Sequence, residues 1–168
     1  MNLRNNDELI KVLQTDGTKK LILATNNGMA IRFNEEDVKS TGRSASGIRA
    51  IRLKKDSVIS MDIANDDETL ITVTETGFGK RSKISDYRLI RRGGVGVINI
   101  KPVHGKVVGA KTVNKEDEIL FITEKGIIMR TPVKNLSTIG RNTSGLRLIK
   151  LNENDKLVSI AKIVENNL

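Results

Sequence analysis

Apolar and polar residues follow one another in short runs that predict strands rather than helices. The clearest stretch lies between residues 58 and 101, where β-branched or apolar runs of about six residues are separated by turn-forming residues. The turn before Phe78 contains Gly77, which we expect to adopt a positive φ. Helix signals are weak, with a single turn expected over 35–39. The expected strands are Val58–Ile63, Leu70–Thr74, Phe78–Ser82 and Val95–Ile100.

The same pattern recurs every 49 residues, without a gap, through the whole chain. Equivalent positions hold the same residue type at Gly28, Gly77 and Gly126, and apolar, arginine and glycine columns stay in register around them. Four short strands in each unit are typical of an all-β, propeller-like array of blades. The chain therefore has the pattern of one repetitive domain rather than of two unrelated ones.

We expect a single partial array with its blades at 7–53, 56–101 and 105–151. Residues 155–168 repeat only the first strand of a unit and would belong to a further or closing blade. We also expect the chain to begin on a first strand that no fourth strand precedes. Because a ring needs more than three blades, we expect either a fragment of a longer protein or an arc whose open edges need partners.

Composition narrows the function classes. The 168 residues include no cysteine and a single histidine, His104, so disulfide chemistry and a dedicated zinc site are not expected. No apolar run approaches the ~20 residues of a membrane span, and the N-terminus lacks a signal segment. No phosphate-binding GxxxxGK[ST] motif occurs, and no nucleophile–base or carboxylate pair stands out. We therefore expect no catalysis, metal or cofactor in this chain.

The formal net charge of +9 is unevenly distributed along the repeat. The second halves of the units, residues 28–53, 77–101 and 126–151, carry +2, +6 and +5, which leaves −4 for the rest of the chain. Equivalent positions of a radial repeat lie along one rim, so these halves should form a positive stripe. Such segregation favours nucleic acid over a merely soluble basic surface.

Duplex DNA is the expected form of nucleic acid. Single-strand binders stack bases on aromatic side chains, but the chain has only three phenylalanines and Tyr87, and both Phe121 and Tyr87 occupy apolar columns that predict burial. What remains are three Arg-Gly loops, GRSASG at 42–47, RRGGVG at 91–96 and GRNTSG at 140–145. Glycine allows close backbone approach to a phosphate and arginine supplies charge, so these loops suit backbone contacts without base reading.

Four stretches resemble one known family. MAIRFNEEDVKSTGRSASGIRAIRL (29–53), GFGKRSKISDY (77–87), GVGVINIK (94–101) and GRNTSGLRLIKL (140–151) are similar to the C-terminal domain of bacterial DNA gyrase A, particularly its last three blades. The resemblance implies a β-pinwheel, a propeller-like ring that exchanges strands between neighbours. It also implies a module that wraps duplex DNA around a basic perimeter and so supports negative supercoiling by the holoenzyme.

The family's hallmark box, Q-[RK]-R-G-G-[RK]-G, is incomplete here. The nearest stretch, IRRGGVG at 90–96, lacks the glutamine and the second basic residue. The resemblance implies that ATP and magnesium are used elsewhere in the holoenzyme, that the remainder of gyrase A together with gyrase B are partners, and that the protein is cytoplasmic and nucleoid-associated. The C-terminal domain of the topoisomerase IV A protein and a protein-interaction propeller remain alternatives.

The candidate DNA-binding residues lie on the matching columns of the three units, and their expected role is neutralisation of phosphate charge. For Arg49 and Arg147, which lie on expected strands, a surface role without contact is an equal alternative. The full set is Arg32, Arg43, Arg49 and Arg52 in the first unit, Lys80, Arg81, Arg91, Arg92 and Lys101 in the second, and Arg130, Arg141, Arg147 and Lys150 in the third.

Overall fold

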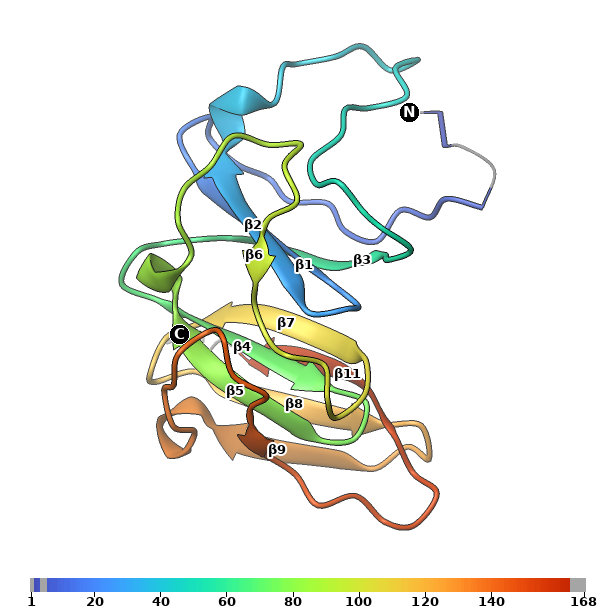
Figure 1. Ribbon diagram of the computed structural model, residues 1–168, viewed down its shortest axis with the longest axis vertical. Helices are drawn as coiled ribbons and strands as arrows, with labels where there is room; N and C mark the ends of the chain where they lie inside the picture. Colours follow the sequence, from blue (N-terminus) through green and yellow to red (C-terminus); the bar gives the residue numbers. More distant parts are fainter. Residues whose placement is uncertain (1, 4–5, 164–168) are drawn as a thin grey trace, which may run out of the picture.

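The computed structural model describes residues 2–3 and 6–163, which form three antiparallel sheets that follow one another along the long axis (Figure 1). Within these residues the only helices are three-residue 3-10 turns, and none could cross a membrane. The strands are β1 (Lys20–Thr25), β2 (Met29–Asn34), β3 (Val58–Ile63), β4 (Thr69–Thr74), β5 (Phe78–Lys83), β6 (Val97–Ile98), β7 (Val107–Val113), β8 (Glu118–Thr123), β9 (Ile128–Pro132), β10 (Leu146–Arg147) and β11 (Leu157–Ile163); the turns are η1 (Glu35–Asp37), η2 (Ile84–Asp86) and η3 (Val133–Asn135).

Each sheet is built around a hairpin with a glycine in its turn. The hairpins β1–β2, β4–β5 and β8–β9 close at Gly28, Gly77 and Gly126, whose φ angles are 82°, 80° and 81°. The positive φ expected at Gly77 is therefore confirmed. The all-β fold and the turn expected at the start of 35–39 are confirmed as well, whereas the strand expected over Val95–Ile100 is limited to β6.

Strands are exchanged between successive units. The sheet orders are β3-β1-β2-β6, β10-β5-β4-β7 and β11-β8-β9. The first strand of a unit pairs with the second strand of the unit before it, and its fourth strand pairs with that unit's third. A complete sheet therefore takes its strands from two consecutive units, and the borders expected at 53–56 and 101–105 run through the sheets.

The expectation that the chain begins on a first strand is wrong. Residues 7–16 run without strand structure, and so do residues 45–53, where the fourth strand of the first unit was expected. Their counterparts one unit later, β3 and β6, pair with β1 and β2 of the unit before, whereas no described strand pairs with residues 7–16 or 45–53. Among the described residues, the third sheet also has no strand equivalent to β6 or β10 beside β9. Of the expected final segment 155–168, residues 164–168 lie outside the described part of the chain.

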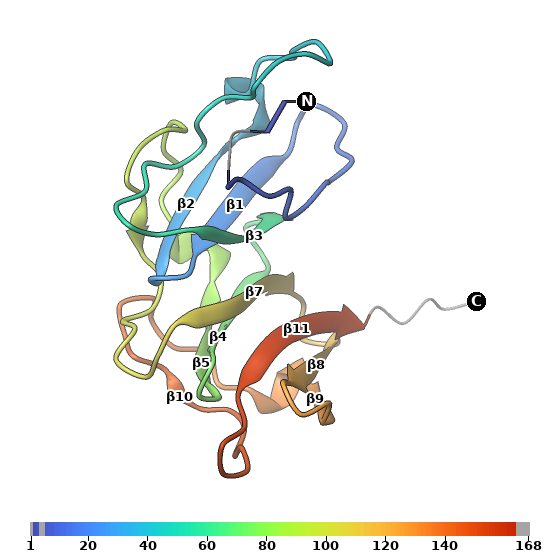
Figure 2. The same cartoon turned by 90° about the vertical axis from the view of Figure 1, so that its right-hand side faces the viewer.

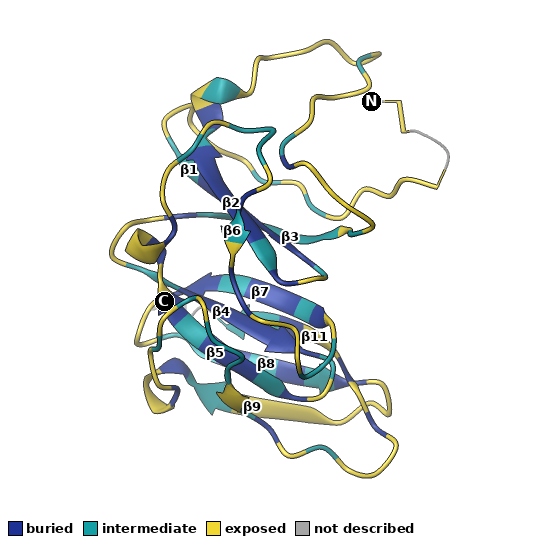
Figure 3. Cartoon of the chain, viewed as in Figure 1, coloured by how far each residue is buried: buried dark blue, intermediate teal, exposed yellow. Residues whose placement is uncertain are grey.

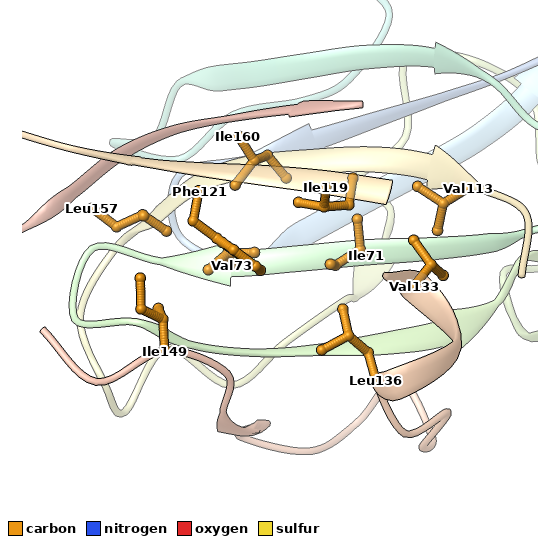
Figure 4. Close-up of a cluster of buried hydrophobic side chains, with 10 residues drawn as sticks. All are labelled: Ile71, Val73, Val113, Ile119, Phe121, Val133, Leu136, Ile149, Leu157 and Ile160. Atoms are coloured by element: carbon orange, nitrogen blue, oxygen red, sulfur yellow. The ribbon is translucent and has the colours of Figure 1, made fainter. Parts of the chain in front are cut away.

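The core lies between neighbouring sheets. Figure 4 shows Ile71 and Val73 of β4 facing Ile119 and Phe121 of β8, and all four side chains are buried. Further along, β3 contacts β7 and β7 contacts β11, so the first strands line one side of the stack. The burial expected for Phe121 and Tyr87 is confirmed. Burying each such side chain contributes about 1.5–3 kcal/mol.

Candidate nucleic-acid interface

The Arg-Gly loops are linked from unit to unit through the backbone. The amide of Arg52 donates to the Gly94 carbonyl at 2.7 Å, and the amide of Lys101 donates to the Thr143 carbonyl at 2.9 Å. The two bonds occupy equivalent positions, so the second and third loops each rest on the fourth-strand segment of the unit before. In Figure 2 these two loops lie with β10 along one side of the stack, away from β11.

Seven of the candidate cations are exposed on the three loops and on the segments that follow them. We call this set the basic edge. These side chains come from three successive units and are exposed to solvent. The units that carry them are linked by the two backbone hydrogen bonds described above. The members are Arg43, Arg49, Arg52, Arg91, Lys101, Arg147 and Lys150.

Arg92 and Arg141 fasten each loop to the preceding unit. The Arg92 side chain donates from Nε to the Asp37 carbonyl at 2.6 Å and from Nη1 to the Arg49 carbonyl at 3.1 Å. Arg141 repeats both bonds one unit later, to the carbonyls of Asp86 and Ile98. The recurrence of this arginine column therefore has a structural cause that the sequence did not reveal. Both side chains are half-buried and hold the loops in place.

Arg32 is inside the protein. It is 4% exposed, and its guanidinium donates to the carbonyls of Ile84 and Tyr87 and pairs with the carboxylate of Asp66. These contacts tie β2 to the η2 turn of the next unit. Its charge is used within the fold, so we leave Arg32 out of the basic edge.

Lys80 is also buried, which corrects its expected place at the surface. Its ammonium donates to the Ser82 hydroxyl at 2.5 Å and lies 3.3 Å from the Gly140 carbonyl. Burial lowers the pKa of Lys80 to about 7. Its column holds Ile31 and Met129 in the other units, so an apolar column was the available signal of burial.

Arg81, Arg130 and Arg147 have different surroundings. Burial lowers the pKa of the half-buried Arg81, whose carbonyl accepts the Ile139 amide. Arg130 is exposed and pairs with the Glu118 carboxylate. The Arg147 guanidinium lies 5.1 Å from the ring centroid of Phe78, whose ring stacks on that of His104. Arg147 is thus held in position while its charge stays in solvent.

Four exposed cations beside the 3-10 turns do not belong to the predicted set. They are Lys39, Lys83, Arg88 and Lys134. None of them belongs to a column that is basic in all three units. Lys39 and Arg88 share a column with Ser137, Lys83 has an asparagine and a proline as counterparts, and Lys134 has a glutamate and a serine. They add exposed positive charge to the segments that precede the Arg-Gly loops in the sequence.

The exposed side chains of this arrangement can neutralise a polyanion. Among residues 2–3 and 6–163 no group of three or more His, Cys, Asp or Glu side chains could hold a metal ion. Exposed arginines and lysines on glycine loops provide charge and hydrogen-bond donors for phosphate oxygens.

Comparison with known proteins gives a consistent match. The family model described as "DNA gyrase C-terminal domain, beta-propeller" matches residues 19–65, 68–114 and 117–163. The first of these spans begins just before β1 and ends just after β3, and the others follow the sheets in the same way. Each family repeat therefore contains three paired strands of one sheet, β1, β2 and β3 in the first span, while the fourth strand of that sheet, β6, lies in the next span.

The relatives and solved structures cover different shares of the chain. The DNA gyrase A protein of Haloquadratum walsbyi is 48% identical over 69 residues, 40% of this chain and 8% of that protein. The corresponding protein of Halalkalibacterium halodurans is 51% identical over 51 residues, 30% of this chain and 6% of that protein. The matched segments thus span less than a tenth of these curated relatives.

Two solved domains superpose on nearly the whole of this chain. The C-terminal domain of DNA topoisomerase IV superposes with a TM-score of 0.91 at 28% identity, over 96% of this chain and 52% of that one. The DNA gyrase A C-terminal domain superposes with a TM-score of 0.87 at 29% identity, over 98% of this chain and 57% of that one.

Proposed function

Since the chain belongs to the DNA gyrase C-terminal domain family, we propose that it binds duplex DNA along the basic edge and bends it around the stack. The observation that supports this proposal is the backbone link between successive units, through the amides of Arg52 and Lys101. It puts exposed cations of three units in one ordered series. A duplex following that series meets positive charge at each step.

The contacts would be to phosphates rather than to bases. The basic edge contains arginine and lysine, whereas the aromatic side chains of Tyr87 and Phe121 are buried and cannot stack on a base. Binding of this type depends on charge and on the cost of bending the duplex, and depends little on sequence.

The parent protein would be gyrase A. The relatives found by sequence are gyrase A proteins, and the topoisomerase IV domain is similar in structure at nearly the same identity as the gyrase domain. In that setting this chain does no chemistry. It presents bound DNA to the rest of a type II topoisomerase. Other parts of that holoenzyme use ATP and magnesium. The chain acts in the bacterial cytoplasm.

The salt dependence of binding tests the proposal. If six phosphates are neutralised, the logarithm of the binding constant should fall against the logarithm of salt concentration with a slope of roughly −5. Fluorescence anisotropy with a labelled duplex at several salt concentrations measures it. Binding that ignores salt between low and physiological ionic strength would refute the phosphate mechanism.

A matched pair of variants locates the interface. Arg52→Ala removes a cation of the basic edge, and Lys115→Ala removes another exposed cation in the turn that joins β7 to β8. We expect Arg52→Ala to reduce the salt slope by about 0.9, with Lys115→Ala leaving it unchanged. Equal effects of the two variants would mean that DNA does not follow the edge.

A further inference from the structure

Five buried side chains of the second unit carry polar groups at positions that are almost all apolar in the other units. We call them the polar cluster, and each is at most 1% exposed. In Figure 3 the strands that carry three of them, β4 and β5, are mostly buried. The members are Thr72, Lys80, Ser82, Tyr87 and Asn99. Their counterparts are Leu23, Ile31, Phe33, Val38 and Ala50 in the first unit and Phe121, Met129, Thr131, Leu136 and Leu148 in the third, of which only Thr131 is polar.

Hydrogen bonds join the members of the polar cluster to one another. The Tyr87 hydroxyl donates to Oδ1 of Asn99 at 2.6 Å, and Nδ2 of Asn99 donates to the Thr72 hydroxyl at 2.9 Å. The Lys80 ammonium donates to the Ser82 hydroxyl at 2.5 Å, and Ser82 also interacts with the Tyr87 hydroxyl. Buried polar groups are costly unless they are hydrogen-bonded. The cluster is therefore a connected network and not a set of isolated substitutions.

Lys80 and Ser82 connect the polar cluster to the third Arg-Gly loop. The Ser82 hydroxyl donates to the Ile139 carbonyl at 2.7 Å, and the Lys80 ammonium lies 3.3 Å from the Gly140 carbonyl. Beside the second loop the counterpart of Lys80 is Ile31, an alkyl side chain that lies close to the loop. The third loop thus rests on a titratable group at a place where the second loop meets only carbon.

The charges that face Lys80 come from the η2 turn and from the third loop. Burial has the largest effect and disfavours the ammonium, the carboxylate of Asp86 favours it, and the guanidinium of Arg141 disfavours it. Together they lower the pKa of Lys80 to about 7, so this side chain gains or loses its proton near neutral pH. Burial raises the pKa of Tyr87, which stays neutral there. On the side of the first sheet, Arg32 reaches the η2 turn but is paired with a carboxylate of its own.

We infer that Lys80 is a positioning residue of the proposed DNA interface, which holds the third Arg-Gly loop by its Gly140 carbonyl and takes up a proton when duplex DNA binds there. The inference rests on the proposed function, because the phosphates of bound DNA are the charges that favour the ammonium. A phosphate beside the loop adds negative charge close to a buried group, where charges interact more strongly than in water. The protonated side chain also makes the stronger hydrogen bond to the loop.

The coupling between DNA and this proton has a definite sign. Bound DNA raises the pKa of Lys80 above its value of about 7 in the free protein. The affinity for DNA is therefore highest below pH 7 and falls as the pH rises through the pKa of the bound state. A rise of about 0.5 in this pKa makes binding roughly threefold tighter at pH 6 than at pH 8.5.

Anisotropy titrations of a labelled duplex at constant salt, at pH 6, 7 and 8.5, test the coupling. We expect the threefold loss of affinity in the wild type but not in Lys80→Met, which places the residue of the third unit in this column. Lys83→Met removes an exposed lysine of the same strand and should keep the pH dependence of the wild type. His104→Gln removes the single histidine of the chain and should keep it too.

Calorimetric titrations in two buffers of different ionisation enthalpy count the proton directly. If the pKa rises from about 7 to about 7.5, the wild type should take up about 0.3 proton more than Lys80→Met when it binds DNA at pH 7.25. A side chain that only packed against the loop would change neither this proton count nor the pH profile.

If Lys80→Met had the pH profile of the wild type, whatever its affinity, the role of Lys80 would be structural and the inference would be overturned. Lys80→Arg stays charged at every pH and should also lose the pH dependence, which keeps the test decisive if Lys80→Met does not fold. Binding of the wild type that is independent of pH would overturn this inference alone. Absence of DNA binding at every pH would overturn the proposed function along with it.

Discussion

Adjacent basic residues of one loop can differ in role, because only one of them contacts the preceding unit. Arg91 and Arg92 are neighbours in one Arg-Gly loop, but only the Arg92 side chain is hydrogen-bonded to the preceding unit. Arg91 is exposed on the basic edge. Of these adjacent arginines, one anchors the loop and the other is free of that contact and available for the proposed phosphate binding.

Alanine substitutions at these two positions should have opposite consequences. We expect Arg92→Ala to lower the free energy of unfolding by about 1.5–3 kcal/mol, the usual contribution of hydrogen bonds to a charged group. Arg91→Ala should change it by less than about 0.5 kcal/mol but weaken DNA binding. Urea unfolding and anisotropy titrations measure the two effects, and a stability loss shared equally by both variants would contradict the assignment.

The buried ammonium of Lys80 should make stability depend on pH. Its pKa in the folded protein, about 7, lies below the unfolded value of 10.5. Between these values the unfolded chain binds more protons, so the free energy of unfolding rises with pH. We expect a gain of roughly 2 kcal/mol between pH 7 and 9 from this group.

Lys80→Met is the matched variant, since Met129 and Ile31 occupy the column in the other units. Urea unfolding at pH 7 and pH 9 should show the gain in the wild type and its loss in Lys80→Met. If both proteins gained equally, the dependence would arise from other groups, such as Lys111, whose pKa is also lowered by burial.

The strands themselves could be predicted from the sequence, but their partners could not. The spacing of apolar runs identified Val58–Ile63 as a strand with the bounds it has in the structure. The partner of a strand depends on which strand edges of the neighbouring unit are free to form hydrogen bonds. The alternation of apolar and polar residues within one unit does not contain that information. The same gap in information misplaced Arg32, because the next unit covers a side chain that would otherwise face solvent, whereas the burial of Lys80 could have been predicted from its apolar column.

At Gly28 and Gly77 a glycine is required by close contact with the exchanged strand as well as by the positive φ of the turn. In Gly28→Ala the new Cβ would lie 2.2 Å from the Ile100 carbonyl oxygen at a φ of 82°. Gly140 has an ordinary φ and open space around it. We expect Gly28→Ala to cost about 2–3 kcal/mol or more and Gly140→Ala less than about 1 kcal/mol in either direction. Thermal unfolding of the two variants distinguishes them, and similar losses would mean that the exchanged strand does not constrain the turn.

At the scale of the whole molecule, three sheets are stacked along one axis (Figure 1), and the exposed cations of the basic edge come from three successive units of this stack. If the duplex bends as proposed to keep contact with all of them, the bend costs about 1–6 kcal/mol for a site of 20–30 base pairs. A single loop makes no such demand on the duplex.

Energy transfer between dyes at the two ends of a short duplex should increase when the protein binds. A protein with Lys101→Ala and Lys150→Ala retains the edge of the first unit but loses exposed charge in the other two. We expect it to bind more weakly and to bend the duplex less. An unchanged end-to-end distance at saturating wild-type protein would show that binding does not require bending.

The exchange of strands also sets the order in which the molecule can be completed as it is made. β2 receives its outer partner only when Val97 has been synthesised, although β2 itself ends at Asn34. At roughly 5–20 residues per second, that delay is about 3–13 seconds. During this time the nascent first sheet has an open apolar edge, and the hairpin behind it cannot be finished locally. Each blade thus depends on translation of the next, and a ribosome that stalls between units leaves the previous sheet incomplete.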